Sequence, residues 1–237
     1  MDMRFVGEFI GTMLLIVFGT GLLAGLNLNK SLSKGANWLI VCFGWGFSVM
    51  IGVFASGLFD SGGHLNPAVT IAFALGGMFD WADVVPYIIA QVAGAFVGAT
   101  FTVIHYYPHF KATPKAEVHT LGIFSTGPAI DHKIWNLVSE ISGTFFFIFS
   151  LLFITGGNIA DGLAPLLVGF LIVVIGFSFG PTTGFAINPA RDLGPRLAYA
   201  LLPIPNKGDA NWQYQWVTIV GPIMGAVLAV AAFNAIT

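Results

Sequence analysis

The chain has 237 residues, of which 56% are hydrophobic and only 8% are charged, and its formal net charge is -2. About a quarter of the residues of an average soluble domain are charged, so this chain has too few charges to cover a soluble surface. The composition excludes a disordered chain, a nucleic-acid-binding protein and most soluble enzymes, and it predicts an integral membrane protein.

Six apolar stretches are long enough to cross the hydrocarbon core, which requires about 20 residues of helix. They are continuous apolar runs and not ten-residue alternations, which favours helices over a β-barrel. Glu8 inside the first stretch and the absence of a cleavage site argue against a signal peptide there. In chain order the stretches are residues 5–26, 38–58, 84–106, 135–154, 164–179 and 217–236.

Two further apolar segments, residues 66–76 and 188–202, are too short to cross the membrane, and we expect them to be re-entrant helices. Each starts with an Asn-Pro-Ala triplet, in which Asn suits the N-cap and Pro suits the first helical position. Two such helices of about 15 Å each, placed end to end, would complete a seventh crossing. The triplets are Asn66-Pro67-Ala68 and Asn188-Pro189-Ala190.

The sequence also repeats itself. The residues EFIGT at 8–12 recur as EISGT at 140–144, and the first Asn-Pro-Ala triplet recurs in the second half. Each half contains three spans, and because three is odd the second half enters the bilayer in the opposite orientation. We therefore expect an all-α integral membrane protein, an inverted repeat of three transmembrane helices plus one re-entrant half-helix each. Residues 1–107 form the first repeat, 108–133 an extramembrane linker loop and 134–237 the second repeat.

The two re-entrant helices predict the chemistry of the site between them. Each helix N-terminus carries about half a positive charge, so two that meet at the midplane repel cations and protons. The side-chain amides of Asn66 and Asn188 can donate hydrogen bonds to the oxygen of a passing neutral molecule. This arrangement favours a channel for uncharged solutes that carry hydroxyl groups.

Residues 61–70 (SGGHLNPAVT), the second triplet and the repeated Glu-x-x-Gly-Thr together resemble the aquaporin (major intrinsic protein) family over essentially the whole chain. The resemblance implies a pore in every protomer, a homotetramer, a plasma-membrane location and cytoplasmic termini. It also implies that Glu8, Glu140 and His64 support the half-helix loops, with a proton relay as the alternative for the two glutamates. The lysines of the odd-numbered loops predict the opposite orientation by the positive-inside rule.

The resemblance further implies a constriction beside the second half-helix. Arg191 follows the second triplet and would hold solute hydroxyls and repel cations. Trp45 and Phe185 would form an apolar corner, and Gly176 stands where strict water channels place a histidine. Without the resemblance, lipid contact or core packing would explain the two aromatic residues. Asp192 marks the glycerol-facilitator branch and is not expected to bind solute, and a helix-dipole or ion-pair role for it stays open.

The sequence thus predicts a passive channel, not an enzyme, that conducts glycerol, related small uncharged solutes and water and excludes ions and protons. The related solutes are dihydroxyacetone, urea, hydrogen peroxide and protonated lactic acid. We expect membrane lipid around the protein and no nucleic acid, metal or cofactor. The alternatives are a water-selective aquaporin, an ion-coupled secondary transporter, whose coupling acids are missing, and an intramembrane hydrolase at Ser178, which lacks the strand-turn-helix context of its motif.

Overall fold

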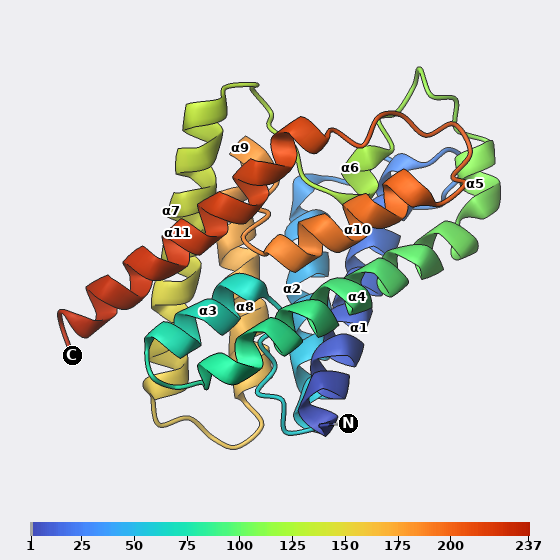
Figure 1. Cartoon of the computed structure of the whole chain (residues 1–237). Coiled ribbons are helices and arrows are strands. Elements are labelled where there is room, and N and C mark those ends of the chain that lie inside the picture. The colour runs from blue at the N-terminus through green and yellow to red at the C-terminus, as the bar shows by residue number, and fades with distance from the viewer. Residues whose placement is uncertain (1) are drawn as a thin grey trace.

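The computed structural model describes residues 2–237, and that part of the chain folds into helices without a strand (Figure 1). Four short elements connect the larger ones: α5 (Tyr107–Lys111), α6 (Leu121–Phe124), α9 (Gly180–Thr183) and the 3-10 helix η1 (Trp212–Tyr214). The two half-helices are α3 (Pro67–Leu75) and α10 (Pro189–Leu201). The six long helices are α1 (Met3–Asn27), α2 (Trp38–Gly57), α4 (Trp81–His105), α7 (Lys133–Gly156), α8 (Ala164–Ser178) and α11 (Gln215–Asn234).

The predicted all-α membrane fold with six long and two short helices is confirmed. Five of the long helices are long and apolar enough to cross a membrane, whereas α8 has only 15 residues. Helix α8 ends at Ser178. Pro181 follows three residues later, and proline lacks the backbone N–H that would continue the helix. The short helix α9 then carries the chain onward to Gly184, whose φ of 80° turns it back toward the centre of the bundle.

One pair of long helices packs closely in each half of the chain. Helix α1 lies against α4 in the first half, and α7 lies against α11 in the second. Glycines permit these contacts, since a Cβ atom on Gly98 would lie 2.6 Å from the carbonyl oxygen of Met13, and one on Gly225 would lie 2.5 Å from that of Ile141. Small residues thus bring whole helix backbones into contact, as is usual where lipid removes the hydrophobic drive for helix association.

The linker between the halves is only partly a surface loop. Helix α6 packs against α1 and α10, and the side chains of Phe110 and Phe124 are completely buried. The linker therefore reaches the half-helix α10, and its contacts there belong to the site described below.

Substituting Gly98 with alanine tests the α1–α4 contact. We expect Gly98→Ala to lower the free energy of unfolding in detergent by about 1–3 kcal/mol, because the methyl group overpacks the interface. Gly21→Ala in α1 is the control, since its Cβ would meet no atom within 4 Å. It should leave stability unchanged or raise it by up to about 1 kcal/mol through helix propensity. Equal stability of the two variants would contradict the packing argument.

Candidate functional site

The two half-helices meet at their N-termini, and each is capped by the asparagine of its own triplet. The Oδ1 atom of Asn66 accepts a hydrogen bond from the backbone N–H of Ala68 at 2.9 Å. The Oδ1 atom of Asn188 accepts from the N–H groups of Ala190 and Arg191 at 3.0 and 3.1 Å. These bonds fix the orientation of both amides, with the oxygen toward the helix and the NH2 group away from it.

The NH2 groups of the two asparagines bind the opposite half of the chain. Asn66 Nδ2 donates to the carbonyl of Ile187 at 2.9 Å, and Asn188 Nδ2 donates to the carbonyl of Leu65 at 2.8 Å. Each NH2 group has a second proton. The two amides are therefore held in place and each retains one donor for a solute.

The segments that precede the triplets are held by the two buried glutamates. The carboxylate of Glu8 accepts from the backbone N–H of His64 at 2.9 Å and of Leu65 at 2.7 Å. The carboxylate of Glu140 accepts from Ala186 and Ile187 in the same way, at 3.0 and 2.9 Å. Three residues of these segments have left-handed backbone conformations, namely Leu65, Phe185 and Ile187. Such conformations are costly for side chains other than glycine, so the two carboxylates stabilise a strained backbone.

This anchoring decides where the neighbouring carbonyls point. In a trans peptide the C=O of one residue points opposite to the N–H of the next. Because the N–H groups of His64 and Leu65 point at Glu8, the carbonyls of Gly63 and His64 point away from it. The same holds in the second half for Phe185 and Ala186, and all four of these residues line one cavity.

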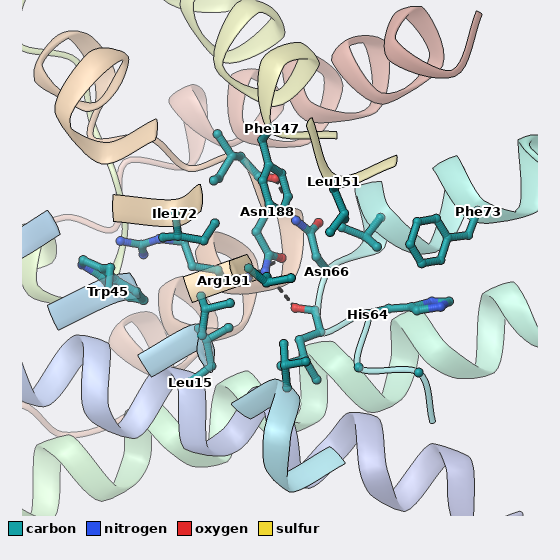
Figure 2. Close-up of a pocket in the computed structure, with 18 of the residues that line it drawn as sticks. Leu15, Trp45, His64, Asn66, Phe73, Phe147, Leu151, Ile172, Asn188 and Arg191 are labelled. Carbon is teal, nitrogen blue, oxygen red and sulfur yellow. Dashed lines mark hydrogen bonds between the residues drawn. The ribbon is translucent and has the colours of Figure 1, made fainter. Parts of the chain in front are cut away.

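Both asparagines line the cavity (Figure 2). Trp45 and Arg191 lie on one side of Asn66 and Asn188 in this view, and His64 and Phe73 lie on the other. Apart from the asparagines, Arg191 and the backbone carbonyls, the walls are mainly apolar. The apolar side chains include Leu15, Val49, Phe147, Leu151, Val168 and Ile172.

Three of the four residues expected at the constriction lie together on this cavity: Trp45, Phe185 and Arg191. The guanidinium carbon of Arg191 is 3.9 Å from the centre of the Trp45 ring. Its Nη1 atom donates to the carbonyl of Phe124 at 3.1 Å. The guanidinium is thus fixed on one side by a ring and on another by a carbonyl, and its remaining N–H groups are available to a ligand.

Gly176, the fourth expected residue, is not part of the cavity wall. A Cβ atom there would lie 3.0 Å from Cys42 Sγ and 3.2 Å from Phe185 Cζ. The carbonyl of Gly176 accepts a hydrogen bond from Trp38 Nε1 at 3.0 Å. The missing side chain therefore makes room for the Phe185 ring, so Gly176 acts on the cavity through Phe185.

Asp192 and His64 also have definite places. Asp192 is completely buried, away from the cavity, and forms an ion pair with Arg196 at 2.7 Å. The backbone of His64 binds Glu8, while its Nδ1 atom lies 3.1 Å from Thr70 Oγ1. The His64 ring also lines the cavity and packs among aromatic rings, the nearest being Phe79 at 4.7 Å between ring centres.

Two groups that hold the site, the side chain of Gln91 and the carbonyl of Phe124, were not predicted from the sequence. Gln91 Nε2 donates to Glu8 at 2.7 Å and to Thr70 Oγ1 at 2.9 Å. A buried amide inside an apolar span is costly, and that signal could have identified Gln91. The carbonyl of Phe124 gave no signal, because a backbone group carries no side-chain signature and its partner Arg191 is 67 residues away.

Comparisons with known proteins agree with this geometry. A family model described as "Major intrinsic protein" matches residues 2–233. Glycerol uptake facilitator protein 2 of Lactiplantibacillus plantarum is 54% identical over 95% of this chain and 95% of its own. The glycerol uptake facilitator protein of Bacillus subtilis is 54% identical over 98% of this chain and 84% of its own. The X-ray structure of the aquaglyceroporin from Plasmodium falciparum has a TM-score of 0.82 at 30% identity, covering 98% of this chain and 95% of that one.

Replacing Glu8 with glutamine tests the anchoring of the first loop. An amide must turn an NH2 group toward a backbone N–H or the Gln91 amide, so a buried donor loses its acceptor. We expect Glu8→Gln to lower the free energy of unfolding by about 1–3 kcal/mol. The control is the exposed Glu117, whose carboxylate accepts from Asn29 at 2.8 Å. Thermal unfolding followed by tryptophan fluorescence should show Glu117→Gln close to wild type, and a Glu8→Gln protein of equal stability would contradict the anchoring role.

Proposed function

The chain belongs to the major intrinsic protein family, as its motifs predicted, and we propose that it is a passive channel for glycerol, related small uncharged solutes and water. The observation that carries the proposal is the meeting of Asn66 and Asn188 on a cavity that is also lined by Trp45, Phe185 and Arg191. The family consists of passive channels, so the protein is a channel and not an enzyme.

The walls of the cavity suit a polyol. Arg191 offers N–H donors to hydroxyl oxygens, while the rings of Trp45 and Phe185 give the carbon backbone an apolar contact. Beyond them the carbonyls of Gly63, His64, Phe185 and Ala186 accept hydroxyl protons, and the free amide protons of the asparagines donate. A chain of such weak sites lets a solute exchange one hydrogen bond for another as it moves.

The same residues exclude ions. Two helix N-termini point at the middle of the cavity, and the guanidinium of Arg191 adds a full positive charge near one end. A cation or a hydronium ion meets repulsion at both places and finds no carboxylate on the cavity wall to compensate it. In the described part of the chain, the carboxylates of Glu8 and Glu140 accept hydrogen bonds from backbone N–H groups and do not line the cavity.

We place the channel in the plasma membrane as a homotetramer, with residues 1–107 and 134–237 as inverted repeats joined by 108–133. The pairing of α1 with α4 and of α7 with α11 supports the repeat. Exposed aromatic side chains on α2 and α8, such as Phe47, Phe54 and Phe170, give an apolar outer face that lipid or a neighbouring protomer would cover.

Stopped-flow light scattering on proteoliposomes tests the function. Vesicles that contain the protein should shrink under an impermeant osmolyte and re-swell quickly under glycerol, without an ion gradient. Flow of water without glycerol would favour a water-selective channel. Dependence of glycerol entry on an ion gradient would favour a secondary transporter instead.

The Arg191→Ala variant tests the constriction in the same assay. Loss of the guanidinium removes the hydroxyl-binding donors, and we expect glycerol permeability relative to water permeability to fall about tenfold, since hydrogen bonds to charged groups contribute about 1.5–3 kcal/mol. Arg4→Ala is the control, because Arg4 pairs with Asp2 and Asp83 at one end of the bundle. Unchanged solute ratios in Arg191→Ala would refute the role of Arg191.

We propose that both termini lie in the cytoplasm, so that the linker 108–133 faces outward. Cys42 is the only cysteine and is buried, which leaves a clean background for labelling. A membrane-impermeant maleimide should label Lys115→Cys on intact cells and should label Asp161→Cys only after permeabilisation. The reverse pattern would establish the orientation that the lysine distribution favours.

A further inference from the structure

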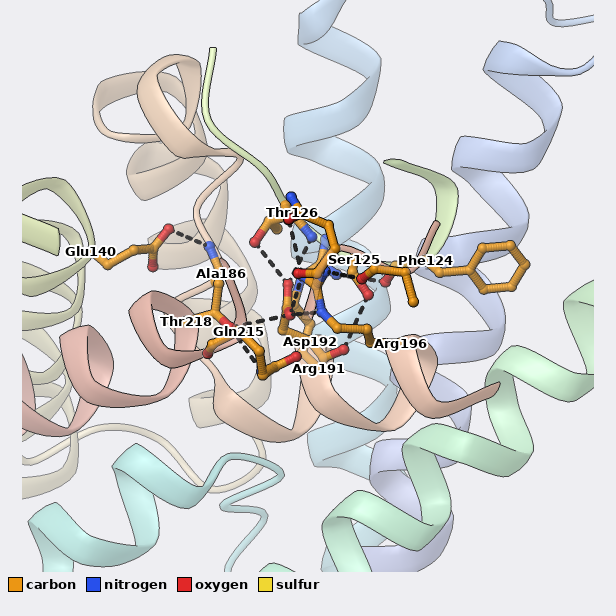
Figure 3. A network of polar contacts seen from close by, with 12 residues as sticks. Phe124, Ser125, Thr126, Glu140, Ala186, Arg191, Asp192, Arg196, Gln215 and Thr218 are labelled. Carbon is orange, nitrogen blue, oxygen red and sulfur yellow. Dashed lines mark hydrogen bonds and ion pairs between the residues drawn. The ribbon is translucent and has the colours of Figure 1, made fainter. Parts of the chain in front are cut away.

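A buried ion pair lies behind the constriction. Arg196 donates to the Oδ1 atom of Asp192 from Nε at 3.0 Å and from Nη2 at 2.7 Å, and both side chains are completely buried. A buried pair of this kind is weak support for stability by itself, because desolvation offsets the attraction. Arg196 also donates to the carbonyls of Ala210 and Asn211, and Asp192 accepts from Thr218, while further contacts of the pair lead to the linker between the two repeats (Figure 3).

These contacts hold Thr126 on two sides. The N–H and the hydroxyl of Thr126 donate to the Oδ2 atom of Asp192 at 2.7 and 2.8 Å. The carbonyl of Thr126 accepts from Arg196 Nη2 at 3.1 Å. The neighbouring Ser125 hydroxyl donates to the backbone carbonyl of Asp192, also at 3.1 Å. The linker is thus fixed to the first turns of α10 at two consecutive residues.

The residue before this attachment supplies the acceptor for Arg191. The carbonyl of Phe124 takes the 3.1 Å hydrogen bond from Arg191 Nη1. Within residues 2–237 it is the one protein hydrogen bond that the guanidinium makes. Because the guanidinium is planar and rigid, the place of this carbonyl, together with the Trp45 ring, determines where its free N–H groups point.

We propose that Asp192 and Arg196 form a clamp on Thr126 that positions Arg191 and thereby tunes which solutes the channel passes. Both are positioning residues, since neither touches the cavity. The inference rests on the proposed function, in which Arg191 binds solute hydroxyls.

The clamp also keeps the neighbouring carboxylate of Asp192 from pairing with the guanidinium of Arg191. Asp192 follows Arg191 directly in the sequence, yet its two carboxylate oxygens accept from Thr126, Arg196 and Thr218. The carboxylate is therefore neutralised by Arg196. Arg191 keeps its positive charge and its donors for the cavity.

A matched pair of variants tests the clamp. Thr126→Val removes the hydroxyl that binds Oδ2 from the linker. Thr218→Val removes the hydroxyl that binds Oδ1 at 3.1 Å, but it comes from α11, which supplies no acceptor to Arg191. In the stopped-flow assay we expect Thr126→Val to lower the ratio of glycerol to water permeability about fivefold, the effect of one lost hydrogen bond. Thr218→Val should keep the wild-type ratio, and Thr126→Ser, which retains the hydroxyl, should restore it.

Two results would overturn the clamp. Wild-type ratios in Thr126→Val would mean that the Phe124 ring, stacked 5.9 Å from that of Phe110, holds the carbonyl without help. Equal losses in Thr126→Val and Thr218→Val would mean that the network is merely structural.

A crystal structure of Thr126→Val separates the clamp from the proposed function. If wild-type vesicles fail to conduct glycerol, the proposed function is wrong. The clamp is then judged by the structure alone. Displacement of Arg191 Nη1 from the Phe124 carbonyl would support it, and an unchanged hydrogen bond would refute it.

Discussion

The structure depends on one constraint: backbone N–H and C=O groups at membrane depth find no water in the lipid and must either bind partners within the protein or face a water-filled cavity. The chain interrupts its helices twice at this depth, before α3 and before α10. The asparagine side chains cap the first turns of these helices, and Glu8 and Glu140 take the N–H groups of the strained segments before them. The carbonyls and amide protons that remain unpaired on the cavity wall can form hydrogen bonds with a solute. The interrupted backbone is therefore both the main difficulty of the fold and the source of its binding groups.

The buried charges follow a division of labour. The carboxylates of Glu8 and Glu140 hold backbone segments, and Asp192 and Arg196 neutralise each other while they hold the linker. Arg191 alone among these buried ionisable residues lines the cavity. Among the residues that the structure describes, the other buried charges bind protein partners, since an unpaired charge would be costly at this depth.

Local rules predicted much of this from the sequence. Continuous apolar runs located the six long helices, and the capping preferences of Asn and Pro located both half-helices, because each of these signals lies within one segment. The resemblance to the major intrinsic protein family predicted that Trp45, Phe185 and Arg191 lie close together. Contacts between distant segments were not predicted: Gln91 donates to Glu8, the carbonyl of Phe124 accepts from Arg191, and Phe185 fills the space beside Gly176. Such contacts depend on how helices pack, and no short pattern in the sequence encodes them.

The cross-bonds between the asparagines and the opposite loops impose an order on biogenesis. The carbonyl that receives Asn66 belongs to Ile187, which the ribosome adds 121 residues later. At about 5–20 residues per second this interval lasts on the order of ten seconds. During that time the Nδ2 group of Asn66 lacks the carbonyl that accepts from it in the folded protein. The contact between the two half-helices is therefore a late step of assembly, because it can form only after residue 187 has been synthesised.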